Sequence, residues 1–136
     1  MDFSKLQGLV PAVIQDDASN EVLMVGFMND EALRRTRETG YATFFSRSRN
    51  QLWTKGETSG NRLEVVSMLT DCDDDTVLVR VRRLGDGNVC HTGQRTCFFR
   101  RVDEVDNPQF AIRPSASSGR PEPVEGRSPQ SQESEQ

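Results

Sequence analysis

Thiol and carboxylate groups are crowded into one short segment of the chain. Residues 71–75 read Asp-Cys-Asp-Asp-Asp. In an extended segment Asp71, Asp73 and Asp75 would project to one side, where like charges raise one another's pKa values or require a cation. Carboxylate oxygens suit Mg²⁺, whereas the sulfur of Cys72 suits Zn²⁺. An acidic turn without a ligand is the alternative interpretation of this segment.

The only histidine of the chain lies between the other two cysteines. His91 follows Cys90 directly, and Cys97 comes six residues later. No CxxC pair is present, so the spacing alone is a weak zinc signal. It is compatible with a closed structural Cys₃His site, and also with an open site in which three thiolates bind zinc and His91 stays free to transfer protons. Only the open site leaves a coordination position for water, as a hydrolase requires.

Basic and hydroxyl side chains alternate in a third segment. Residues 46–49 read Ser-Arg-Ser-Arg, and a glycine-bounded loop over residues 55–61 follows the only tryptophan. Guanidinium groups are forked donors for phosphate oxygens, and glycines let backbone N–H groups approach an anion. The pattern favours a phosphate-binding surface over the alternative of a solvated loop. The candidate substrate-binding residues are Arg47, Ser48, Arg49, Trp53, Lys55, Thr58 and Ser59.

Short apolar runs bounded by Gly, Asn or Asp predict six strands around these segments. The predicted strands cover residues 10–15, 21–27, 41–46, 63–70, 76–83 and 97–102. In the fifth strand valine alternates with leucine and arginine, which is typical of a half-buried antiparallel strand. One helix is predicted over about residues 29–39, with Asn29 as its N-cap and Gly40 as its C-terminal stop. The expected fold class is α+β, mostly antiparallel, with a second short helix left unplaced.

Length and charge limit the class of protein. The 136 residues suffice for one domain, and 17 basic against 21 acidic residues give a net charge of −4. No Lys/Arg run exceeds two residues, which argues against non-specific nucleic-acid binding. The sequence predicts no signal peptide and no membrane span, so we expect a cytoplasmic protein. In a reducing compartment an odd number of cysteines favours metal ligands or nucleophiles over disulfides.

The last thirty residues differ in composition from the rest of the chain. Residues 107–136 contain five of the six prolines together with six serines. Their few apolar side chains cannot offset the conformational entropy that ordering would remove. We therefore expect one folded domain over residues 1–106 and a Pro/Ser-rich, mostly disordered tail over residues 107–136.

Five separated blocks of the sequence together resemble the phosphoribosyl-AMP cyclohydrolase family of histidine biosynthesis. Their order and spacing fit as well, and the resemblance covers about residues 8–101. The blocks are Leu23-Met24 with Met28-Asn29 and Glu31-Ala32-Leu33; Ser46-Arg47-Ser48-Arg49; Trp53 with Lys55-Gly56-Glu57-Thr58-Ser59-Gly60-Asn61; Asp71-Cys72-Asp73 with Asp75; and Cys90-His91-Thr92-Gly93 with Cys97-Phe98-Phe99.

The resemblance implies a hydrolase that acts on phosphoribosyl-AMP. This substrate is an adenine nucleotide with a second phosphoribosyl group on ring N1, which makes ring atom C6 electrophilic. Attack of water at C6 and cleavage of the N1–C6 bond open the ring to a formimino-carboxamide ribonucleotide. Zinc lowers the pKa of a bound water from about 16 toward about 7, so that hydroxide is present at neutral pH.

The family's functional residues map onto positions of this chain. His91 is the expected catalytic proton shuttle, because an imidazole can both accept and donate a proton near neutral pH. The resemblance also implies an intertwined homodimer with one zinc per subunit, shared between the chains. A strand of about eight residues, spanning about 27 Å, separates Cys72 from the other cysteines and agrees with sharing. The expected zinc ligands are Cys72, Cys90 and Cys97, and the expected magnesium ligands are Asp71, Asp73 and Asp75.

A binding module is the alternative from a different class of protein. It would be stabilised by a closed Cys₃His zinc site and would recognise nucleotides or RNA without converting them, with Trp53 stacking on a base and residues 46–49 binding phosphate. A structural zinc site beside an acidic cluster without a ligand is a second alternative. The ligands of zinc separate these interpretations, because a closed site uses His91 as a ligand and the hydrolase leaves it unligated.

Overall fold

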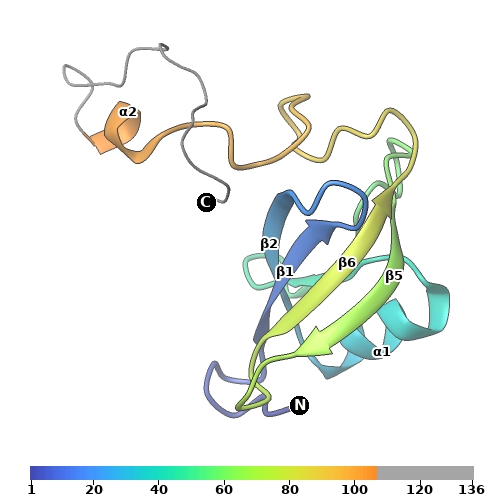
Figure 1. Cartoon of the computed structure of the whole chain (residues 1–136). Helices are drawn as coiled ribbons and strands as arrows, with labels where there is room; N and C mark the ends of the chain where they lie inside the picture. The colour runs from blue at the N-terminus through green and yellow to red at the C-terminus, as the bar shows by residue number, and fades with distance from the viewer. Residues whose placement is uncertain (107–136) are drawn as a thin grey trace. The chain divides into compact units, whose positions relative to one another are not determined.

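A four-stranded mixed sheet with the strand order β2-β1-β6-β5 is the centre of the fold (Figure 1). The strand β2 pairs antiparallel with β1, and β5 pairs antiparallel with β6, whereas β1 and β6 run parallel. A separate antiparallel pair is formed by β3 and β4. The strands are β1 (Val10–Asp16), β2 (Val22–Met28), β3 (Thr43–Ser46), β4 (Gln51–Thr54), β5 (Leu63–Thr70) and β6 (Val77–Arg83).

The computed structural model describes residues 1–106 of the chain. Two units are distinguished, Met1–Phe99 and Arg100–Gln136. The first holds the sheet, the β3–β4 pair and the helix α1 (Asp30–Thr39), and the described part of the second holds the helix α2 (Val102–Asp106). The predicted tail lies outside the described residues, and the predicted domain boundary at residue 106 stays a prediction. Within residues 1–106, neither helix has the length and apolar character that crossing a bilayer requires.

Alternating side chains on β1 and β6 build the core. Val77 and Val79 are buried, and each is paired with a buried side chain of β1, Ala12 and Ile14. The helix α1 and the β3–β4 pair pack around β2 and enclose the fully buried Phe44. Each fully buried side chain of this size stabilises the fold by roughly 1.5–3 kcal/mol, so this face of the sheet holds the molecule together.

The opposite face of the sheet carries an apolar row that crosses all four strands. Val13 of β1 is paired with Val25 of β2 and with Leu78 of β6, and Leu78 is paired with Leu69 of β5. Paired residues point to the same side of a sheet, so these four side chains are neighbours. Val25 is 45% exposed and Leu69 is 50% exposed. We call Val25, Val13, Leu78 and Leu69 the apolar row.

The helix α1 confirms the predicted caps. The Asn29 side chain accepts a hydrogen bond from the backbone N–H of Ala32 at 2.8 Å, and Asp30 complements the positive end of the helix dipole. Gly40 ends the helix in the left-handed region at φ 80°, where its N–H donates to the Thr36 carbonyl. The helix therefore begins and ends where local side-chain chemistry alone requires.

The predicted strands need two corrections. The strand predicted over 97–102 is wrong, because the backbone N–H of Cys97 binds the Leu23 carbonyl in an irregular segment and α2 begins at Val102. This α2 is the short helix that could not be placed. The strand β4 was missed. The prediction of mostly antiparallel strands is confirmed, with β1 and β6 as the one parallel pairing among the described strands, a pairing that the long intervening segment of residues 17–76 permits.

Candidate functional site

The turn between β5 and β6 brings three carboxylates together. Asp71, Asp73 and Asp75 each offer an oxygen atom, and these atoms lie within 4.8 Å of one another. Asp71 Oδ1 accepts backbone hydrogen bonds from Asp75 at 3.0 Å and Thr76 at 3.2 Å, which closes the turn. In residues 1–106 no other group of three or more metal-ligating side chains comes together in this way. The spacing of the three aspartates thus corresponds to a real cluster.

A lysine from the N-terminal segment occupies this acidic cluster. Lys5 Nζ lies 3.0 Å from Asp73 Oδ2 and 2.9 Å from Asp75 Oδ2. Hydrogen bonding to Lys5 lowers the pKa of Asp75 to about 2, and the same contacts raise the pKa of Lys5. Desolvation, together with the neighbouring carboxyl groups, raises the pKa of Asp71. The Lys5 ammonium group therefore lies where a metal cation would bind these carboxylates, and the sequence patterns did not predict this contact.

Two of the three thiols meet in the loop that follows β6. Thr92 donates a hydrogen bond from Oγ1 to Cys90 Sγ at 3.1 Å, and this bond with the Thr92 backbone N–H lowers the pKa of Cys90. Burial, followed by the neighbouring Cys90, raises the pKa of Cys97. The Cys90 and Cys97 side chains influence each other's pKa, and the positive charge of Lys55 favours the thiolate form of both. The surroundings of this pair therefore favour the thiolate form more strongly at Cys90 than at Cys97.

The loop that carries Cys90 is closed by its own backbone. Cys90 donates to the Gln94 carbonyl at 3.0 Å and accepts from the Gly93 N–H at 2.9 Å. Gly93 has φ +92°, a conformation that L side chains rarely adopt. His91 is exposed at the tip of this turn. Gly93 therefore makes a tight loop possible, and this loop exposes His91 to solvent next to Cys90.

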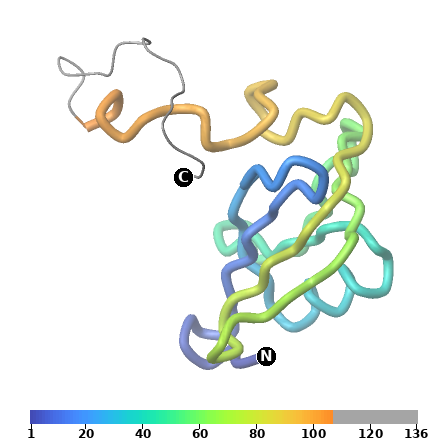
Figure 2. Tube along the Cα trace, viewed as in Figure 1, coloured from blue at the N-terminus to red at the C-terminus, as the bar shows by residue number. Residues whose placement is uncertain are grey.

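Cys72 lies at the other end of β6. Figure 2 shows the turn that contains it and the loop after β6 separated by the length of that strand. Within residues 1–106 the three cysteines do not form a common cluster in one chain. The structure thus joins Cys90 with Cys97 and leaves Cys72 apart.

An open pocket of about 620 Å³ lies between β2 and the β3–β4 pair. Gly26 allows the Phe44 ring to pack directly against the β2 backbone. Any larger residue at position 26 would clash, because its Cβ would lie 2.5 Å from Phe44 Cδ1. The Arg47 guanidinium stacks over the Phe27 ring at 4.7 Å, and Trp53 packs on Phe44 with ring centroids 4.9 Å apart. The lining residues are Gly26, Phe27, Phe44, Phe45, Ser46, Arg47, Ser48 and Trp53.

Four of the predicted substrate-binding residues lie outside this lining. Arg49 is exposed in the turn between β3 and β4. Lys55 is the residue whose charge reaches the two thiols. Thr58 and Ser59 are exposed in the loop after β4. That loop is tied to the segment directly after β6, because Asn61 Oδ1 accepts a hydrogen bond from the Asp86 backbone N–H at 2.9 Å.

The aromatic walls of the pocket were not among the site residues predicted from the sequence. Phe27 and Phe44 lie in runs that were assigned to strands only, and their apolar character signalled burial rather than a site. The facing pair Gly26 and Phe44 becomes visible only when β2 and β3 lie together.

Comparison with known proteins covers the elements just described. A family model described as Phosphoribosyl-AMP cyclohydrolase matches residues 24–99, from β2 to the segment after Cys97. The chain belongs to the phosphoribosyl-AMP cyclohydrolase family. The match includes the pocket, the acidic turn and the thiol loop, so all three candidate regions lie inside the family's extent.

Curated relatives agree over a larger part of the chain. The phosphoribosyl-AMP cyclohydrolase of Solibacter usitatus is 58% identical over 115 residues, which cover 81% of this chain and 90% of the relative. That of Listeria innocua is 56% identical over 104 residues, covering 76% and 95%. The histidine biosynthesis bifunctional protein of Bacteroides thetaiotaomicron is 56% identical over 104 residues, covering 76% and 50%.

Membership of the phosphoribosyl-AMP cyclohydrolase family confirms two predictions. The resemblance stated from the five sequence blocks is confirmed, and so is an enzyme of the hydrolase class in place of a binding module. The metal ligands, the role of His91 and the homodimer stay predictions.

Proposed function

We propose that the chain opens the adenine ring of phosphoribosyl-AMP at a zinc site shared between two subunits. The reaction belongs to histidine biosynthesis, the pathway for which the Bacteroides relative is named. The observation that carries the proposal is the convergence of the Cys90 and Cys97 thiols beside an exposed His91, in a member of this hydrolase family. A cytoplasmic location stays a prediction.

The thiol loop suits zinc by the chemistry of its donors. Thiolates are the soft ligands that zinc prefers, and the lowered pKa of Cys90 favours its thiolate form. Cys72, with Cys90 and Cys97, would complete a set of three thiolate ligands. When bound, zinc supplies a Lewis acid that lowers the pKa of water from about 16 toward about 7.

His91 is left free in this arrangement to move protons. It is exposed at the tip of the thiol loop, where its imidazole can accept a proton from the water that attacks C6. As the N1–C6 bond breaks, the same group can return the proton to N1. Imidazole is a side chain that can both accept and donate a proton near neutral pH.

The pocket between β2 and the β3–β4 pair suits the nucleotide. Arg47 and Ser48 offer a guanidinium and a hydroxyl to phosphate oxygens, while Phe27 and Trp53 offer aromatic walls to the ring. Arg49, Lys55, Thr58 and Ser59 extend this polar surface along the adjoining loops. Binding here would orient the substrate rather than supply protons.

The acidic cluster suits magnesium. Its three carboxylates are hard oxygen donors that lie within 4.8 Å of one another, and Lys5 marks the place where they accept positive charge. We assign Mg²⁺ to Asp71, Asp73 and Asp75. Because Mg²⁺ keeps several waters, an exposed turn is a suitable place for it.

A second copy of the chain supplies what one chain lacks. Cys72 lies one strand length from the other thiols, so a neighbouring subunit is the source that brings it to them without refolding β6. The apolar row offers a surface for such a copy, since four apolar side chains cross the sheet there and two of them are about half exposed. We assign one zinc per subunit, shared across a homodimer.

Incubation of the purified full chain with phosphoribosyl-AMP tests substrate, reaction and metal together. Ring opening should change the ultraviolet absorbance, and a chelator should abolish this change. Adding back zinc and magnesium separately assigns the requirement to one metal or both. AMP is the matched control, because it lacks the N1 substituent that makes C6 electrophilic. Unchanged absorbance with metal-loaded protein would contradict the proposed activity.

A further inference from the structure

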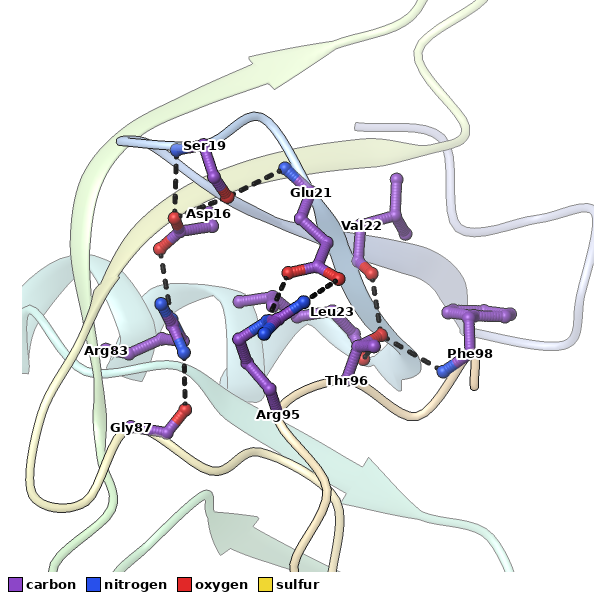
Figure 3. Close-up of polar contacts among 10 residues, drawn as sticks. All are labelled: Asp16, Ser19, Glu21, Val22, Leu23, Arg83, Gly87, Arg95, Thr96 and Phe98. Atoms are coloured by element: carbon purple, nitrogen blue, oxygen red, sulfur yellow. Dashed lines mark hydrogen bonds and ion pairs between the residues drawn. The ribbon is translucent and has the colours of Figure 1, made fainter. Parts of the chain in front are cut away.

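Thr96 is a buried threonine that the proposed reaction does not use. It is 8% exposed, and its Oγ1 lies 2.8 Å from the Val22 carbonyl and 3.2 Å from the Leu23 carbonyl. The Phe98 backbone N–H donates to the same oxygen at 3.0 Å (Figure 3). A hydroxyl has one proton, so Thr96 donates to one of these β2 carbonyls at a time while accepting from Phe98.

These bonds surround Cys97. The Cys97 backbone N–H itself donates to the Leu23 carbonyl at 2.8 Å. The peptide groups before and after the Cys97 α-carbon are therefore both fixed, the first by β2 and the second by Thr96 Oγ1. With both peptide planes held, the direction of the Cα–Cβ bond is set and only the side-chain torsion of the thiol remains free.

The residue before Thr96 is fastened to the same part of the sheet. Arg95 Nε and Nη2 lie 2.7 Å and 3.1 Å from the two carboxylate oxygens of Glu21, a forked ion pair visible in Figure 3. Glu21 comes directly before β2. Residues 95–97 thus bind residues 21–23 through consecutive contacts, whereas the exposed Phe98 and Phe99 that follow lie in an irregular segment.

We infer that Thr96, assisted by Arg95, is a positioning residue that holds Cys97 toward Cys90 before the metal binds. This inference rests on the proposed zinc site. Without the Thr96 hydroxyl, the N–H of Phe98 would lose its partner and the segment would have to be ordered when zinc binds. That ordering opposes binding, and outer contacts of this kind change metal affinity by about 10–100-fold.

Zinc affinity of the metal-free full chain, measured against a chromophoric chelator, tests the inference. Thr96→Val should bind zinc about 10–100-fold more weakly than the wild type. Thr96→Ser keeps the hydroxyl and should restore affinity to within about threefold. Thr36→Val is the matched control, because Thr36 is another buried hydroxyl that bridges backbone groups, the Ala32 carbonyl and the Thr43 N–H. It should lower the melting temperature and leave zinc affinity unchanged.

The possible outcomes separate this inference from the proposed function. Failure of the wild type to bind zinc would overturn both. Zinc binding by the wild type and equally by a folded Thr96→Val would overturn the role of Thr96 alone. If circular dichroism shows that Thr96→Val is unfolded, Arg95→Gln decides, because it alters an exposed pair. We expect about threefold weaker zinc binding for Arg95→Gln, and unchanged affinity would overturn the inference.

Discussion

The two ends of β6 differ in donor chemistry and in the forces that hold them. The turn before β6 presents exposed carboxylates, and the N-terminal segment contacts it through the ion pairs of Lys5 with Asp73 and Asp75 and through a backbone hydrogen bond from the Asp2 N–H to the Asp74 carbonyl. The loop after β6 presents thiols, and Thr96 with the Cys97 backbone ties it to β2. Exposed ion pairs contribute little and exchange readily, whereas buried hydrogen bonds fix geometry. The acidic end is therefore suited to a cation that exchanges, and the thiol end to a metal that stays.

The largest expected effect is on the thiol end. Cys90→Ser should lose most of its zinc and its activity together, because a neutral hydroxyl replaces a soft, charged thiolate. Zinc content by atomic emission and turnover by absorbance are the measurements. Cys72→Ser should behave in the same way although it lies at the opposite end of β6. Normal zinc content in Cys90→Ser would remove this residue from the ligand set.

Replacing His91 should lower turnover and leave zinc binding unchanged. His91→Ala is expected to keep its zinc and its fold and to lose about 10²-fold or more in turnover, the effect of removing a general acid–base group. Zinc content and kinetics on the same preparation are needed. If zinc leaves together with the histidine, the closed Cys₃His site is correct instead.

Mixed dimers test whether the two ends of β6 meet between subunits. Cys72→Ala and Cys90→Ala chains, each inactive alone, are refolded together, so that half of the dimers are mixed and each has one complete site. About a quarter of the wild-type activity should return. Separation of mixed dimers by charge tags and ion exchange provides the control. No recovery from well-formed mixed dimers would contradict a shared site.

The acidic end should respond more weakly to the loss of its lysine. Lys5→Met removes the ammonium that competes with an added cation, so Mg²⁺ affinity should rise about two- to fivefold, the range typical of an exposed ion pair. Titration with Mn²⁺ as a paramagnetic probe measures the effect. Zinc affinity is the internal control and should not change. Weaker Mn²⁺ binding would show that Lys5 supports the cluster rather than competing for it.

The smallest expected effect is the loss, at low pH, of the stability that the Lys5–Asp75 contact contributes. Lys5 depresses the pKa of Asp75 to about 2 from an ordinary value of 3.8. The contact therefore stabilises the fold fully above pH 3.8 and is lost as the pH falls toward about 2. The difference in melting temperature between the wild type and Lys5→Met should shrink over that interval. A difference that stays constant down to pH about 2 would assign the effect of Lys5 to packing.

Local patterns predicted those parts of the fold that local forces decide. The alternation Val77, Val79 and Val81 located β6, and Asn29 with Gly40 located α1. The strand expected over 97–102 failed because Cys97 finds its hydrogen-bond partner on β2, about seventy residues earlier in the chain, and that choice leaves no local signal.

In the candidate site, too, local features were predicted from the sequence and long-range contacts were not. The aspartate cluster follows from residues adjacent in sequence, and its spacing was sufficient to find it. Lys5 reaches that cluster from 68 residues away, and Phe27 faces Arg47 only once β2 and β3 are packed. Long-range partners of this kind depend on the whole fold, so no local sequence motif predicts them.

The parallel pairing of β1 with β6 has a consequence for how the molecule forms. Of the four strands in this sheet, β1 comes first along the chain yet occupies an interior position, and its neighbour on one side is β6, the last of the four to be synthesised. Until residues 77–83 emerge, β1 has only the β2 hairpin as a partner, so the sheet closes late and through contacts of high sequence separation, which fold slowly. Both candidate metal sites flank β6. Their formation is thus delayed until synthesis of the sheet is complete, and a nascent chain that stalls earlier has neither site assembled.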